Sequence, residues 1–90
     1  MENLDLLIDS INEVLGIVLI PRKSQVATKY PAIKQCTLEV YQIGSGKKCI
    51  AKHQNNYNIC NTEDEQKAWD TIIKDIIIQL LKHFNINETV

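Results

Sequence analysis

Three cysteines, together with His53, are the residues of this sequence best suited to chemistry: Cys36, Cys49 and Cys60. Thiolate and imidazole are ligands that Zn²⁺ prefers, and Cys49 and His53 are expected on the same face of a strand. The spacing contains no Cys-x-x-Cys knuckle, however, and free cysteines on apolar strands are usually small buried hydrophobic residues. We therefore expect no bound metal and no cofactor.

Catalysis by a cysteine would require an exposed thiol, His53 as its base, and a third group that orients the imidazole. The sequence marks no such group. The clustered carboxylates of Glu63, Asp64 and Glu65 are explained by the start of a helix, where negative charge is favoured, and not by acid–base chemistry. We therefore expect that the chain is not an enzyme.

The segment 44–48, Gly-Ser-Gly-Lys-Lys, suggests a phosphate-binding loop. The Walker spacing requires a glycine five residues before the Gly-Lys pair, and Tyr41 occupies that position. No helix is predicted after the segment either. It is better explained as the basic tip of a β-hairpin.

The longest periodic segment is 62–84, which is predicted to be a helix. Thr62 and Glu65 have the spacing of a capping box at its start, and Lys82 and His83 place positive charge in its last turn. Its apolar residues cover an arc of roughly 180°, wider than the ~100° of a helix with one buried side. We therefore expect neighbours on two sides of this helix, with Ile78 left on its polar side.

The amino-terminal part also has helical periodicity. Apolar residues from Leu4 to Leu15 recur on one face, with Asn3 as the expected cap and Gly16 as the expected stop. The run 17–20, Ile-Val-Leu-Ile, is either a short buried strand or a last helical turn, and periodicity does not decide between them. The basic, aperiodic segment 21–31 has a proline at each end and is predicted to be a loop.

The middle of the chain has the pattern of three antiparallel strands in a meander. Strands are predicted at 36–43, 48–53 and 57–60, joined by a hairpin at 44–47 and by a turn at Asn55-Asn56. This register pairs Val40 with Ala51, Tyr41 with Ile50, and Glu39 with Lys52. Alternation then places one small apolar set against the helices: Cys36, Leu38, Val40, Cys49, Ala51 and Cys60.

These elements predict a single small α+β domain over residues 1–90, with the helices packed on one face of the sheet. The acidic amino terminus, with Asp5, Asp9 and Glu13 among its apolar residues, fits neither a signal peptide nor a membrane span. An odd number of cysteines fits a reducing compartment better than a disulfide framework. We therefore expect a cytoplasmic protein without a membrane partner.

Positive charge is concentrated in the middle of the chain, although the net charge is only −1. Nucleic-acid binding through the hairpin and the 21–31 loop is therefore the alternative function. Double-stranded RNA-binding domains share the order helix, three strands, helix, but the acidic 63–65 segment replaces their lysine-rich last helix, so the shared order assigns no family. The candidate nucleic-acid contacts are Arg22, Lys23, Lys29, Lys47, Lys48 and Lys52.

Protein–protein binding is the favoured function, because the second face of the predicted sheet is too apolar for an ordinary solvent face. The alternative for this face is that Tyr41, Ile50 and Ile59 form a cross-strand cluster that only stabilises the sheet. Such a protein would be a regulator, adaptor or inhibitor of a larger protein, and a second copy of the chain is a further candidate partner. The abundance of Ile, Asn and Lys would suit a phage or mobile element. The candidate partner contacts are Tyr41, Ile43, Ile50, Tyr57, Ile59 and Ile78.

Overall fold

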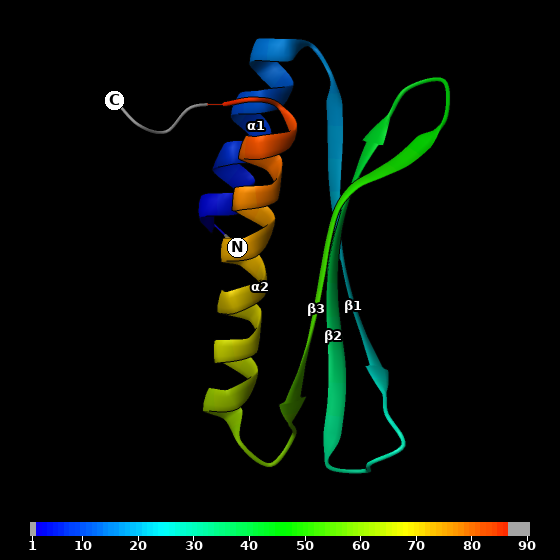
Figure 1. Cartoon of the computed structure of the whole chain (residues 1–90), viewed down its shortest axis with the longest axis vertical. Coiled ribbons are helices and arrows are strands. Elements are labelled where there is room, and N and C mark those ends of the chain that lie inside the picture. Colours follow the sequence, from blue (N-terminus) through cyan, green and yellow to red (C-terminus); the bar gives the residue numbers. More distant parts are fainter. Residues whose placement is uncertain (1, 87–90) are drawn as a thin grey trace.

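A three-stranded antiparallel sheet carries two helices on one of its faces. The structure, a computed structural model, describes residues 2–86. The elements follow in the order α1 (Glu2–Leu15), β1 (Val18–Ala27), β2 (Ile33–Ile43), β3 (Lys47–Asn58) and α2 (Thr62–His83). The strands lie in the order β1-β2-β3. The predicted α+β class, with both helices on one face, is confirmed (Figure 1).

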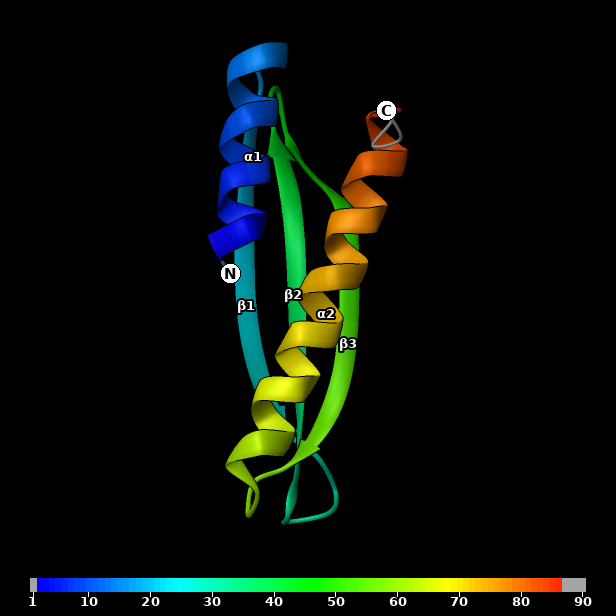
Figure 2. The same cartoon turned by 90° about the vertical axis from the view of Figure 1, so that its left-hand side faces the viewer.

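The core lies between the sheet and the helices. Helix α1 lies over the upper part of β1, whereas α2 crosses the sheet diagonally toward β3 (Figure 2). Each element contributes aliphatic side chains at its own period, every second residue in the strands and every third or fourth in the helices. The residues with 0% exposure are Leu4, Cys36, Leu38, Val40, Ile72, Ile76 and Leu80.

Strand β1 corrects the prediction of a loop over residues 21–31. The strand begins at Val18, which places residues 18–20 in a strand and not in a helical turn, and it continues through Pro21 to Ala27. Only residues 28–32 connect it to β2. Because β1 is an edge strand with one ladder, a proline is tolerated where its missing N–H faces away from β2.

Strand β3 corrects the second turn of the predicted meander. Asn55 and Asn56 lie inside β3, paired with Cys36 and Gln35, so the chain does not turn there. The sheet therefore has β1 in place of the predicted 57–60 strand. The hairpin turn around 44–46 is confirmed, with Ile43 paired with Lys47.

A register shift between Val40 and Tyr41 explains why Cys49 and Ile50 were predicted on the wrong faces of the sheet. The pairs Val40 with Ala51 and Glu39 with Lys52 are confirmed, but Tyr41 pairs with Cys49 and not with Ile50. The extra residue is a β-bulge, and it reverses the alternation on one side of itself. Cys49 is therefore exposed and not in the core, and Cys60, in the turn after β3, is exposed as well.

The two helices have capping features of the expected kinds, but some of them lie at other residues than predicted. Asn61, not Thr62, caps α2, since its side chain accepts hydrogen bonds from the N–H groups of Glu63 and Asp64. The expected cap Asn3 lies inside α1, which already begins at Glu2. Gly16 has a φ of +64° directly after α1, as expected for a glycine that ends a helix.

Truncating Ile76 tests the assignment of the core. Because Ile76 is 0% exposed and Ile78 is 49% exposed, Ile76→Ala should lower the free energy of unfolding by about 2–5 kcal/mol. Ile78→Ala should lower it by less than about 0.5 kcal/mol. Urea unfolding followed by the fluorescence of Trp69 measures both. Equal losses, or a loss at Ile78 that depends on protein concentration, would contradict this assignment.

Candidate interaction surface

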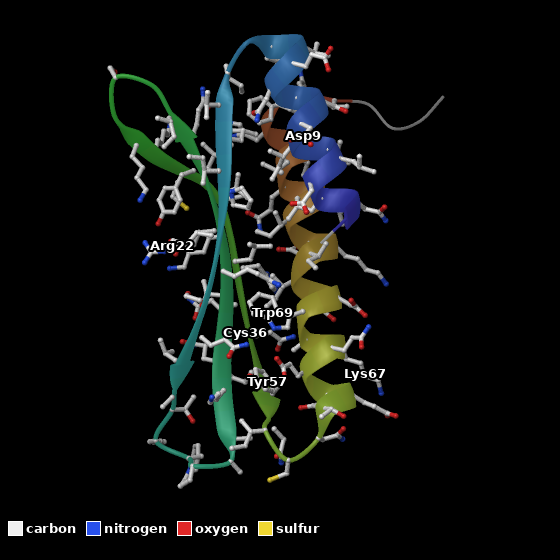
Figure 3. All side chains as sticks on the ribbon, turned by 180° about the vertical axis from the view of Figure 1, so that it is seen from behind. Asp9, Arg22, Cys36, Tyr57, Lys67 and Trp69 are labelled. Carbon is white, nitrogen blue, oxygen red and sulfur yellow. The ribbon has the colours of Figure 1, made fainter. Side chains whose placement is uncertain are left out.

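The face of the sheet opposite the helices is covered by no described element. Side chains alternate across each strand, so every second residue of β1, β2 and β3 projects to this side. Arg22 points away from the helices, whereas Cys36, Tyr57 and Trp69 lie between the sheet and α2 (Figure 3). We call this side the outer face.

Four apolar side chains form one patch on the outer face, near the hairpin end. Val18 pairs with Ile43, and Ile20 pairs with Tyr41, so the four residues are direct neighbours across β1 and β2. Val18 is 51% exposed and Ile20 48%, while Tyr41 and Ile43 are half-buried. We call these four residues the outer apolar patch.

Charged groups surround Tyr41 in this patch. Its hydroxyl donates a hydrogen bond to Oε2 of Glu39 at 2.7 Å, and this bond raises the pKa of Tyr41. The Nζ of Lys47 lies 4.3 Å from the centre of the tyrosine ring. Glu39 is flanked across the sheet by Arg22 on β1 and Lys52 on β3. The patch is therefore apolar at its centre and mainly basic at its rim.

Toward the other end, the outer face becomes polar and uncharged. Ser24 pairs with Thr37 and Thr37 with Gln54, and the next row is formed by Val26, Gln35 and Asn56. Val26 is exposed but pairs across the sheet with the polar residue Gln35. Polar residues are therefore compatible with this face, and the apolar patch is a local feature.

The structure separates the residues predicted to contact a partner. Tyr41 and Ile43 belong to the outer apolar patch. Tyr57 is only 4% exposed and lies in the core, and Ile50 packs partly buried against the same core, so the prediction that these two lie on the outer face is wrong. Ile59 is exposed after the end of β3, and Ile78 is exposed on α2.

Val18 and Ile20 were not among the predicted partner contacts, because the run 17–20 was interpreted either as a buried strand or as a last helical turn. No period-two alternation marks this edge strand, because residues 17–20 are continuously apolar and residues 22–25 continuously polar.

The candidate nucleic-acid contacts do not form one surface. Arg22 and Lys52 lie on the outer face, but Lys23 is on the helix side, with its Nζ 4.7 Å from the centre of the Trp69 ring. Lys29 belongs to the β1–β2 connection. Lys47 and Lys48, at the β2–β3 hairpin, lie at the opposite end of the sheet.

A second apolar surface lies between the two helices. The carboxyl-terminal ends of α1 and α2 diverge over the sheet (Figure 2) and enclose an open cleft of about 320 Å³. Its lining is almost entirely apolar and includes Leu7, Ser10, Ile11, Val14, Leu15, Phe84 and Ile86.

His53 has a carboxylate partner that the sequence did not indicate. Its Nδ1 lies 2.8 Å from Oδ2 of Asp75, and Nε2 of Gln79 donates to the same oxygen at 2.7 Å. No cysteine joins this pair, because Cys36 is buried, Cys49 lies on the outer face and Cys60 follows β3. Within residues 2–86, no cluster of three or more His, Cys, Asp or Glu side chains has the geometry of a metal site.

Gln79 also covers part of the free edge of β3, the edge that has no neighbouring strand among residues 2–86. The N–H of Lys52 donates to Oε1 of Gln79 at 3.1 Å, and Nε2 of Gln79 donates to the carbonyl of Lys52 at 3.0 Å. The side-chain amide thus occupies the place that a neighbouring strand would take. At the end of the strand, Asp64 accepts the N–H of Asn58 at 2.7 Å.

Comparison with protein-family models, with curated proteins and with solved structures finds no match for this chain. Neither described helix combines the length and apolar character needed to cross a membrane. The case for a function therefore depends on the surfaces of the molecule.

Thiol labelling tests the placement of the cysteines. Burial raises the pKa of Cys36, whose Sγ donates to the carbonyl of Asn55 at 3.3 Å. The exposed Cys49 and Cys60 should react with a thiol reagent in the native protein, and Cys36 only after unfolding. Mass spectrometry of the labelled peptides identifies the sites. Fast labelling of Cys36 would contradict its burial in the core, and an unreactive Cys49 would show that the bulge is misplaced.

Removing the amide of Gln79 tests the cover on the β3 edge. Gln79→Ala should raise the hydrogen-exchange rate of the Lys52 amide by about fivefold, which corresponds to the loss of a bond worth about 1 kcal/mol. The amide of Asn58, held by Asp64, is the internal control and should not change. An unchanged Lys52 rate would mean that Gln79 does not protect this edge.

Proposed function

We propose that the protein binds another protein through the outer apolar patch and is not an enzyme. The observation that carries this proposal is the cross-strand cluster of Val18, Ile20, Tyr41 and Ile43 on an uncovered sheet face. Clustered apolar side chains with a polar rim are typical of interaction sites, whereas single exposed apolar residues are common on any surface.

Ile78 is such a single residue. Helical spacing places Lys74 and Lys82 one turn away on either side, and both are exposed. The α2 surface around Ile78 is therefore a weaker candidate than the sheet.

A protein that binds without catalysis suits the role of a regulator, adaptor or inhibitor of a larger protein. The exposed thiols of Cys49 and Cys60 favour a location in the reducing cytoplasm, where they would stay unoxidised. A phage or mobile-element origin remains a proposal from composition alone.

Nucleic-acid binding is the second candidate. Tyr41, with Lys47 over its ring and Arg22 nearby across the sheet, combines an aromatic side chain with positive charge, as single-strand binders do. The wide separation of Lys29 from the hairpin lysines weakens this candidate. Fluorescence polarisation with single-stranded RNA and DNA at two salt concentrations tests it, since contacts with phosphates weaken as salt rises.

A matched pair of substitutions tests the proposed site. Ile20 and Ile78 are 48% and 49% exposed, so Ile20→Asp and Ile78→Asp place the same charge on equally exposed positions. Ile20→Asp should abolish capture of a partner from a lysate of the native cell, and Ile78→Asp should preserve it. Circular dichroism checks that both variants fold.

Loss of capture only in Ile78→Asp would move the site to α2, and capture unchanged in both variants would contradict the proposal. Light scattering after size exclusion identifies the case in which a second copy of the chain occupies the patch.

A further inference from the structure

The two edges of the sheet are treated differently by the rest of the chain. On β3, side chains hold the outward N–H groups of Lys52 and Asn58, and the side chain of Asn55 accepts the N–H of Asn56 at 2.9 Å. Above the bulge, only a short part of β3 remains, and it carries Lys47 and Lys48. The β3 edge is therefore largely closed to another strand.

The upper half of the β1 edge is closed as well. Oδ1 of Asn12, on α1, accepts the N–H of Leu19 at 2.9 Å. In an antiparallel ladder, the groups that face the open edge recur at every second residue. Pro21 is the next outward residue and has no N–H to offer.

The same alternation makes Lys23, Gln25 and Ala27 the outward residues of the lower half of β1. Among residues 2–86, no hydrogen bond to the backbone of these three residues comes from outside the sheet ladder. Their N–H and C=O groups are therefore open on this edge. We call residues 23–27 the open edge.

The side chains beside the open edge are drawn away from it. Lys23 lies over the ring of Trp69 at 4.7 Å, and Nε2 of Gln25 reaches Oε1 of Glu65 at 3.5 Å. Both contacts pull the side chains toward α2. The backbone of the open edge is consequently unobstructed from the side.

We propose that an extended acidic segment of a partner protein adds to the open edge as a fourth strand, antiparallel to β1. This proposal rests on the protein-binding function proposed above and names the chemistry of the partner. Main-chain hydrogen bonds supply affinity in such strand addition, and alternate side chains supply specificity. Here an apolar residue would lie beside Val26, and acidic residues would lie beside Lys23 and Arg22.

Charge disfavours a second copy of the chain as the occupant of the open edge. Antiparallel pairing of two β1 strands around Ser24 would place both helix layers on the same side. The first turn of α2 reaches this part of β1 through the contact between Gln25 and Glu65. The two acidic starts of α2, each with Glu63, Asp64 and Glu65, would then approach each other and repel.

The open edge is also continuous with the proposed binding site. Val18 and Ile20 of the outer apolar patch belong to the same strand, on the hairpin side of Pro21. One partner could therefore contact the patch with its surface and add a strand lower on β1.

A designed peptide tests the proposal on the whole chain. The probe is acetyl-Val-Thr-Thr-Glu-Glu-amide, which in antiparallel pairing places its valine beside Val26 and its last glutamate beside Arg22. Titration of the ¹⁵N-labelled protein to millimolar peptide should shift the amide signals of Lys23, Gln25 and Ala27, with saturation. The same peptide, N-methylated at its second and fourth residues, lacks the two donors that face β1 and should cause no such shift.

Gln25→Pro is the matched protein variant. It removes an outward N–H at a position equivalent to Pro21, so the ladder to β2 stays complete and the fold should persist. The shifts with the peptide should be lost. If this variant does not fold, the comparison of the two peptides on the unchanged protein still decides.

Three results would overturn the proposal. They are no shift at these amides, equal shifts with the N-methylated peptide, and shifts of the same amides with protein concentration alone, which would indicate a second copy. Partner capture separates this inference from the proposed function. Together with the peptide shifts, loss of capture in both Ile20→Asp and Gln25→Pro supports strand addition, whereas loss only in Ile20→Asp preserves the binding function and removes the open edge from it.

Discussion

The packing of α2 across β2 and β3 is the interaction on which the other features of the molecule depend. Ile72, Ile76 and Leu80 are fully buried on the helix, opposite Leu38 and Val40 on the sheet. Helix α1 packs on the same side, so the described chain has no element left for the outer face. A chain of this length buries a limited share of its surface, and one uncovered sheet face follows from that limit. The apolar character of part of that face does not follow from it.

The helices were predictable because each has a long apolar period and clear end signals. Strand β1 was not, since its polar residues 22–25 and Pro21 have the composition of a loop, and only the ladder to β2 makes them a strand. The Asn55-Asn56 pair has the local preferences of a turn, but pairing with Cys36 and Gln35 overrides them. Local sequence preferences gave the wrong prediction wherever pairing with a residue distant in the sequence determined the backbone conformation.

The candidate site shows how one residue changes a whole face. Tyr41 and Ile43 were placed correctly, since their own strand has an unbroken period of two. The turn wrongly predicted at Asn55-Asn56 reversed the predicted alternation beyond it, so Tyr57 was predicted on the outer face although it lies in the core. Because the bulge was not predicted, Ile50 was placed on the outer face in the same way. No local pattern in the sequence marks the bulge.

Strand β1 has the weakest sequence signal of the described elements. It also carries exposed apolar side chains and free backbone hydrogen-bonding groups. Its upper half gives Val18 and Ile20 to the outer apolar patch, and its edge there is closed by Asn12 and Pro21. Its lower half has the reverse arrangement, with polar side chains on the outer face and open backbone groups at the edge. An exposed edge is an aggregation hazard, and the positive charges of Arg22 and Lys23 oppose pairing with another basic strand. In the proposed strand addition, the same charges would attract the acidic segment of the partner.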